Sequence, residues 1–182
     1  MLQHEGDPSH CAVLLPGIRY FSQAPLLWFA REVAQARGWS VVEVDERAPG
    51  DEEPFEWMRG QARRAIDAAG GAELVVVVGK SLGSAAAPLV EGPAAWLTPL
   101  LTRPEIGEAL GAVRAPTLLV GSPADSSWGD GTLPDNPALE VLELPELDHS
   151  LQVSGDPSAS LDALRTVTDR FGAFLDRVAG TP

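Results

Sequence analysis

Residues 75–84 constrain the fold of this 182-residue chain more than any other segment. Four consecutive valines lead directly into a Gly-x-Ser-x-Gly motif centred on Ser81, and three alanines of helical character follow it. This order predicts a buried strand, a sharp turn and a helix. The serine of such a turn lies on a strained backbone, and Gly79 and Gly83 would let the strand and the helix approach each other closely. We therefore expect the Ser81 hydroxyl to project above a sheet.

Two other interpretations of the motif are open to a test on the sequence. Residues 79–81 match the end of a phosphate-binding loop, but that motif needs a glycine where the chain has Leu74, so we exclude it. A turn between strand and helix without any catalytic role remains as the alternative.

Short apolar runs alternate with longer helical patterns along the rest of the chain. This alternation predicts an α/β three-layer sandwich around a central, mainly parallel six-stranded sheet. The expected strands lie at residues 12–15, 40–45, 73–78, 94–97, 117–120 and 139–144. The expected helices lie at residues 24–37, 54–69 and 157–179.

Length, charge and cysteine content limit the kind of protein. The chain fits a single domain at residues 11–180 after a flexible leader at residues 1–10. Its 26 acidic and 13 basic residues give a net charge of -13, which repels nucleic acid and anionic membranes, so we expect neither as a partner. Cys11 is expected in a buried strand. Residues 1–10 lack the pattern of a signal peptide, which predicts a cytoplasmic protein.

A serine nucleophile needs a general base, and the chain has three histidines. His4 and His10 lie in the expected leader, where a solvated side chain is the default interpretation. His149 follows the last expected strand, which puts its loop at the same edge of the sheet as Ser81. We predict His149 as the base, because it comes after the serine and an acid in the chain order typical of such sites. An ordinary surface histidine is the alternative.

The base needs a carboxylate that orients it. Asp125 is the first acid after the strand at residues 117–120 and would accept the Nδ1 proton of the imidazole. Asp130 in the same loop and Asp148 beside the histidine remain alternatives. Asp148 is the weaker of these, because adjacent side chains in a loop seldom face each other.

Acyl transfer also needs donors for a developing oxyanion. We expect the backbone N–H groups of Leu82 and Ile18 to supply them, with Gly17 allowing the substrate to approach closely. A simple turn that ends the first strand is the alternative for residues 16–17. Aromatic residues near these loops are candidate walls of the substrate site, with Tyr20 and Trp128 assigned to it and Trp28 and Trp96 as further candidates. Ordinary packing in the core or at the rim is the alternative for each of the four.

With these residues in place, the chain resembles the α/β-hydrolase superfamily over nearly its whole length. It is most similar to small, dienelactone-hydrolase-like members without a lid. The motifs that carry the resemblance are residues 14–17, 79–83, 121–125 with Trp128, and 148–149. The resemblance implies a reduced α/β-hydrolase fold with no lid domain and with the first strand inside the sheet. The chain departs from the family in having Pro16-Gly17 where many members have His-Gly, and in leaving only residues 98–104 for a lid.

These observations predict a serine hydrolase that cleaves carboxylic esters or thioesters of small acyl groups through an acyl-serine intermediate. No metal or organic cofactor is needed for this chemistry. A non-catalytic binding module on the same fold and an acyltransferase that uses the same three residues are the alternatives. The expected partner is a small-molecule ester or thioester, and a homodimer is left open.

Overall fold

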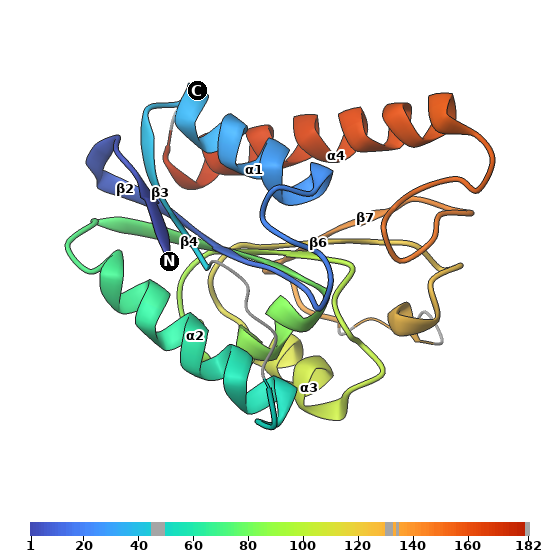
Figure 1. The fold of residues 1–182 in the computed structure, drawn as a ribbon, viewed down its shortest axis with the longest axis horizontal. Helices are drawn as coiled ribbons and strands as arrows, with labels where there is room; N and C mark the ends of the chain where they lie inside the picture. The colour runs from blue at the N-terminus through green and yellow to red at the C-terminus, as the bar shows by residue number, and fades with distance from the viewer. Residues whose placement is uncertain (45–49, 130–132, 134, 181–182) are drawn as a thin grey trace.

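The computed structural model describes residues 1–44, 50–129, 133 and 135–180, and its elements form a three-layer α/β sandwich (Figure 1). The central sheet has the strand order β1-β3-β2-β4-β5-β6-β7. Its β1 pairs antiparallel with β3, whereas the other pairs within the described residues are parallel. The strands are β1 (Leu2–His4), β2 (Asp7–Leu15), β3 (Trp39–Glu43), β4 (Leu74–Lys80), β5 (Ala94–Leu97), β6 (Thr117–Gly121) and β7 (Leu139–Glu143).

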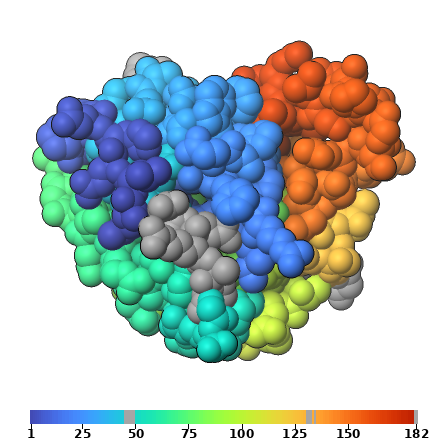
Figure 2. Space-filling view, viewed as in Figure 1, coloured from blue at the N-terminus to red at the C-terminus, as the bar shows by residue number. Residues whose placement is uncertain are grey.

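Helices cover both faces of the sheet (Figure 1). On one face α1 (Pro25–Ala36) packs against α4 (Pro157–Val178), and Figure 2 shows their blue and orange surfaces next to each other. The other face carries α2 (Pro54–Ala68), α3 (Pro104–Ala112) and the 3-10 helix η1 (Ser81–Leu89). A short 3-10 helix, η2 (Ser126–Trp128), follows β6. This arrangement confirms the predicted three-layer architecture.

The predicted helices α1, α2 and α4 are confirmed, with ends within one residue of those expected. Each begins with a proline, whose missing N–H costs nothing in the first turn of a helix. The side chain of Glu53 accepts a hydrogen bond from the Glu56 N–H, and that of Asp156 accepts one from the Ala159 N–H. These carboxylates therefore cap α2 and α4 and complement the positive ends of the helix dipoles.

Side chains of successive strand residues alternate between the two covered faces. In β2, Val13 and Leu15 face α2 and η1, while Ala12 and Leu14 face α1 and α4. Both faces are buried along residues 11–15, so this part of the strand is continuously apolar and shows no polar alternation. Cys11 belongs to this buried run, as predicted. The position of β2 between β3 and β4 also confirms that it lies inside the sheet.

The start of the chain differs from the expectation. Six strands were expected and seven are present, because residues 2–4 form the edge strand β1. The expectation of a leader before the first strand is wrong, since β2 begins at Asp7. His4 is not a free solvated side chain: its Nε2 lies 3.2 Å from Oε1 of Glu43, a buried carboxylate that also accepts a hydrogen bond from Arg31 of α1. The ring of His10 packs against Trp39.

Two helices after the sharp turn also differ from the expectation. The segment of alanines is helical, but η1 is a 3-10 helix and contains Pro88. The helix α3 was not predicted, because Gly107 and Gly111 weaken its helical pattern. In the part of the chain that the structure describes, no helix combines the length and the apolar character needed to cross a bilayer.

Gly121, the last residue of β6, has no room for a side chain. A Cβ atom built there would lie 2.1 Å from the ring of Trp128, whose indole N–H donates a 2.8 Å hydrogen bond to Glu143. We expect Gly121→Ala to lower the free energy of unfolding by about 1–3 kcal/mol, because the ring must move out of a fixed position. Urea unfolding followed by tryptophan fluorescence measures this change.

Gly107→Ala is the matched control. A Cβ at Gly107 meets nothing within 4 Å, so alanine in this helix is expected to raise the free energy of unfolding by about 0.5–1 kcal/mol. Equal effects of the two substitutions, or a stabilised Gly121→Ala variant, would contradict this account of the packing under β6.

Candidate active site

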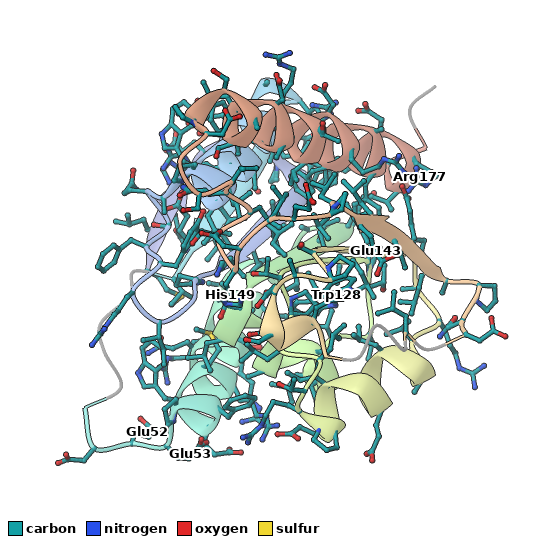
Figure 3. All side chains as sticks on the ribbon, turned by 90° about the vertical axis from the view of Figure 1, so that its right-hand side faces the viewer. Glu52, Glu53, Trp128, Glu143, His149 and Arg177 are labelled. Carbon is teal, nitrogen blue, oxygen red and sulfur yellow. The ribbon has the colours of Figure 1, made fainter. Side chains whose placement is uncertain are left out.

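The residues predicted from the sequence lie on loops at the carboxyl edge of the parallel strands. Figure 3 looks onto this edge, with His149 near the middle and Trp128 beside it. Ser81 follows β4, Asp125 follows β6, and His149 lies between β7 and α4. Three segments far apart in the sequence therefore meet at one edge of the sheet, where ligands bind in open α/β folds.

Ser81 occupies a tight turn between β4 and η1. Its φ of 53° lies in the left-handed region, which costs a non-glycine residue about 1–3 kcal/mol. A Cβ at Gly79 would lie 2.5 Å from the ring of Trp96, and one at Gly83 would lie 2.4 Å from the carbonyl oxygen of Leu15. The two glycines of the motif are thus required by close packing, as the sequence predicted.

A second serine supports the turn from within η1. The Ser84 hydroxyl donates a 2.6 Å hydrogen bond to the carbonyl oxygen of Ser81 and accepts one of 3.1 Å from the Leu100 N–H. Ser84 is fully buried, so these bonds are shielded from water. The strained conformation of Ser81 is therefore held by its own neighbours in the chain.

The structure brings Ser81, His149 and Asp125 into one hydrogen-bonded chain. His149 Nε2 lies 2.7 Å from Ser81 Oγ, and His149 Nδ1 lies 2.6 Å from Asp125 Oδ2. Asp125 is 4% exposed, whereas Ser81 and His149 are half-buried. A buried carboxylate at one end and an accessible hydroxyl at the other provide a path for moving a proton from the hydroxyl to the imidazole.

Asp125, and not Asp148, makes the contact with His149. Asp125 Oδ1 accepts a 2.9 Å hydrogen bond from the Ser127 N–H, which leaves Oδ2 for the imidazole. Asp148 Oδ1 instead accepts hydrogen bonds from two backbone N–H groups of its own loop, those of Ser150 and Gln152. The other alternative, Asp130, lies outside the described residues.

The acid loop and the histidine loop are tied together by Ser122, which the sequence analysis missed. Its buried hydroxyl accepts hydrogen bonds of 3.2 Å from the Ala124 N–H and of 3.1 Å from the Leu147 N–H. A serine directly after a buried strand is the signal that points to such a role. The tie fixes the spacing between Asp125 and His149.

The loop after β2 passes close beside the turn at Ser81. A Cβ at Gly17 would lie 3.0 Å from the Cβ of Ser81, so a side chain there would force these two segments slightly apart. Ile18 follows with a side chain that is 49% exposed. The Leu82 N–H is at the start of η1, among the groups that have no acceptor within their own helix. Both predicted oxyanion donors thus belong to segments that flank Ser81.

The aromatic residues expected as walls of the site divide into two groups. Tyr20 is half-buried, and its hydroxyl accepts a 3.1 Å hydrogen bond from the Leu26 N–H; burial raises the pKa of this phenol. Trp128 and Trp96 are each 1% exposed and belong to the core, so the expectation that Trp128 contacts substrate is wrong. The half-buried Trp28 packs edge to face against Phe29 of its own helix.

Lys80 is the other residue of this edge that the sequence analysis did not assign to the site. It precedes Ser81, is 2% exposed, and places its Nζ 4.6 Å from the centre of the Tyr20 ring. Loss of hydration on burial lowers the pKa of Lys80 to about 8, although the charges of Asp125 and Asp148 oppose this shift. Its signal in the sequence is a charged residue where a buried strand ends.

We found no cluster of three His, Cys, Asp or Glu side chains that would hold a metal ion within residues 1–44, 50–129, 133 and 135–180.

No family model and no curated protein sequence matches this chain. Solved structures do. The esterase domain of a Rhodothermus marinus protein has a TM-score of 0.66 at 16% identity, with 96% of this chain and 91% of that one covered. Est1E from Butyrivibrio proteoclasticus with bound ferulic acid has a TM-score of 0.68 at 14% identity, with coverages of 98% and 94%.

A third structure is that of a serine hydrolase without lid from Xanthomonas campestris. Its TM-score is 0.64 at 13% identity, with 96% of this chain and 83% of that one covered. In the present chain, residues 98–103 are all that separates β5 from α3, where larger relatives were expected to insert a lid. Fold, strand order and these neighbours agree: the chain has the α/β-hydrolase fold, in the form that carries no lid.

Proposed function

We propose that this protein is a serine hydrolase that cleaves carboxylic esters or thioesters of small acyl groups. The observation that carries the proposal is the hydrogen-bonded chain from Ser81 through His149 to Asp125, with distances of 2.7 and 2.6 Å. In this reading Ser81 is the nucleophile, His149 the general base and Asp125 the carboxylate that orients the imidazole.

The first half of the reaction forms an acyl-enzyme. The Nδ1–H group of His149 donates a hydrogen bond to Asp125, so the proton stays on Nδ1 and Nε2 is unprotonated. Nε2 therefore accepts the proton of the Ser81 hydroxyl as Oγ attacks the carbonyl carbon. Collapse of the tetrahedral intermediate breaks the bond to the leaving group, which takes the proton from Nε2. The acyl group is then bound to Ser81 Oγ, and the alcohol or thiol departs.

The second half repeats these steps with water. His149 accepts a proton from a water molecule as the water oxygen attacks the acyl carbon. Collapse of this second tetrahedral intermediate breaks the bond between the acyl carbon and Ser81 Oγ, which takes the proton back from His149, and the carboxylic acid departs. In both halves the negative charge on the carbonyl oxygen needs donors, and we assign these to the backbone N–H groups of Leu82 and Ile18. Backbone donors are pre-organised, so they need no movement when the charge develops.

An apolar cavity next to the histidine loop is our candidate site for the leaving group. It has a volume of about 490 Å³, within the common range of about 300–1000 Å³ for ligand pockets. Ser150, which directly follows His149, lines it together with Leu26 of α1 and Leu161 of α4. The leaving group must lie on the His149 side to receive the proton, so this cavity favours an apolar alcohol or thiol.

Ser81→Ala tests the nucleophile. Removing the hydroxyl leaves no group to form the acyl intermediate, so we expect turnover of p-nitrophenyl acetate to fall by at least about a thousandfold. A fluorophosphonate probe is expected to label the wild-type serine and not the variant. Equal rates for the two folded proteins, or labelling at another residue, would reject Ser81.

Asp125→Asn and Asp148→Asn form a matched pair for the acid. An amide at residue 125 no longer fixes the imidazole in the reactive tautomer, so kcat is expected to fall by roughly ten-thousandfold. An amide at residue 148 keeps an oxygen that accepts from the backbone, so kcat is expected to change by less than about tenfold. A larger loss at residue 148 than at residue 125 would contradict the assignment.

Leu161→Asp tests the leaving-group cavity, because it places a charge on the rim without touching Ser81. We expect kcat/KM for hexyl acetate to fall by about tenfold or more, since an apolar chain then meets a hydrated carboxylate. Methyl acetate, which has the same acyl group and does not fill the cavity, serves as the control substrate and is expected to be hydrolysed as before. An equal loss for both esters would place the leaving group elsewhere.

A further inference from the structure

Lys80 stands apart from the other ionisable side chains of the site, because the proposed reaction gives it no task. It is 2% exposed and forms the end of β4, one residue before Ser81. Among the ion pairs found in the described residues, none includes Lys80, so its charge lacks a carboxylate at contact distance. A buried cation without such a partner is costly and is retained where it has a function.

The groups around the ammonium come from three loops of the candidate site. Tyr20, in the loop after β2, offers its ring face at 4.6 Å, a distance typical of a cation–π contact. Asp125, after β6, and Asp148, before α4, are the charged groups that act on Lys80 through space. Asp125 is in turn hydrogen-bonded to His149.

The loop held by this contact is the one that carries the proposed oxyanion donor. Gly17 and Tyr20 flank Ile18 and Arg19 and form an isolated β-bridge, so the four residues make a tight turn. At one end, a Cβ on Gly17 would lie 3.2 Å from the carbonyl oxygen of Lys80. At the other end, the ring of Tyr20 lies over the ammonium. Lys80 therefore lies close to one end of the turn and contacts the other end, and this turn carries the Ile18 N–H.

We propose that Lys80 is a positioning residue whose buried ammonium holds the turn at residues 17–20 against Ser81, and that this hold is released when Lys80 loses its proton. The inference rests on the proposed function, because the turn matters only if Ile18 donates to an oxyanion. A neutral amine lacks the cation–π attraction for the face of the Tyr20 ring, so deprotonation weakens the contact that fixes the far end of the turn.

Protonation of Lys80 has opposite effects on activity and on stability. Burial holds the pKa of Lys80 near 8, below that of an exposed lysine, so the folded chain releases this proton before the unfolded chain does. Between these two values the unfolded state binds more protons, and the contribution of Lys80 to stability rises with pH. Activity, in contrast, falls over the lower part of this range. Loss of activity from this cause is therefore distinct from alkaline unfolding.

The test is the pH profile of kcat/KM for p-nitrophenyl acetate, with the rate of Ser81→Ala subtracted at each pH. We expect the wild-type value to fall by about fivefold between pH 7 and pH 9 as Lys80 deprotonates, since the neutral form keeps about a tenth of the activity. Lys80→Met, of similar length and without charge, is expected to be about tenfold less active at pH 7 and to show no such fall. Because the oxyanion donor acts in the transition state, kcat should carry the change and KM should not.

Tyr20 supplies a matched pair that leaves Lys80 in place. Tyr20→Leu removes the ring face that the ammonium contacts, so its activity at pH 7 should be about as low as that of Lys80→Met and should show no fall between pH 7 and pH 9. Tyr20→Phe keeps the ring and is expected to leave the fall where it is in the wild type. Urea unfolding over the same pH range reports whether each variant is folded.

The outcomes separate the inference from the proposed function. Absence of turnover at every pH would overturn the hydrolase and, with it, the role of Lys80. Turnover without the fall between pH 7 and pH 9, or the same fall in Lys80→Met, would overturn the role of Lys80 alone. A fall that persists in Tyr20→Leu, or one that accompanies unfolding, would do so as well.

Discussion

The close approach of β2, β4 and η1 at Ser81 is the constraint on which the rest of the site depends. The chain must reverse from strand to helix within one residue, and the φ of 53° at Ser81 is the result. Side chains at Gly79 or Gly83 would overlap Trp96 and the Leu15 backbone, respectively. The strain is supported by packing on every side, which is the condition under which such a conformation persists. The same turn aims the hydroxyl out of the sheet, toward His149.

Each partner of Ser81 lies in a loop that is held by hydrogen bonds of its own, in addition to the contacts between the three residues. Asp125 uses one carboxylate oxygen to cap η2 and the other to bind His149. In the histidine loop, Asp148 accepts hydrogen bonds from two backbone N–H groups. Ser122 joins this loop to the loop of Asp125. Precise geometry therefore does not need a lid that closes over the site, because local hydrogen bonds on a rigid sheet already provide it.

The sequence was most informative where one local cause decides the structure. Continuous apolar runs identified the strands buried on both faces, and glycines around Ser81 identified the turn. The edge strand β1 was not predicted because its three residues, Leu2–His4, carry no apolar pattern. They form a strand by pairing with β3. The helix α3 was not predicted because its two glycines weaken the helical pattern, and the helix is stabilised by packing against η1. Such elements are decided by tertiary contacts, which a single sequence does not display.

The same limit separates the site residues that were identified from those that were not. Chain order was enough to select Ser81, Asp125 and His149, because loops after parallel strands meet at one edge. It was not enough for Trp128, whose ring lies on Gly121 in the core and not in a substrate wall. Whether a loop side chain turns inward depends on the backbone angles of that loop, and those follow from contacts such as the one with Glu143.

The two buried charged residues Glu43 and Lys80 differ in how their charges are compensated. Glu43 is fully buried at the β1 side of the sheet, where Arg31 and His4 lie at 3.1 and 3.2 Å from its carboxylate. Lys80 is buried at the carboxyl edge with an aromatic face as its contact and two carboxylates farther away. Glu43 thus has Arg31 as a direct partner of opposite charge, whereas burial without such a partner lowers the pKa of Lys80 to about 8. Natural folds accept such poorly compensated groups mainly at functional sites, and here the group lies directly beside the proposed nucleophile.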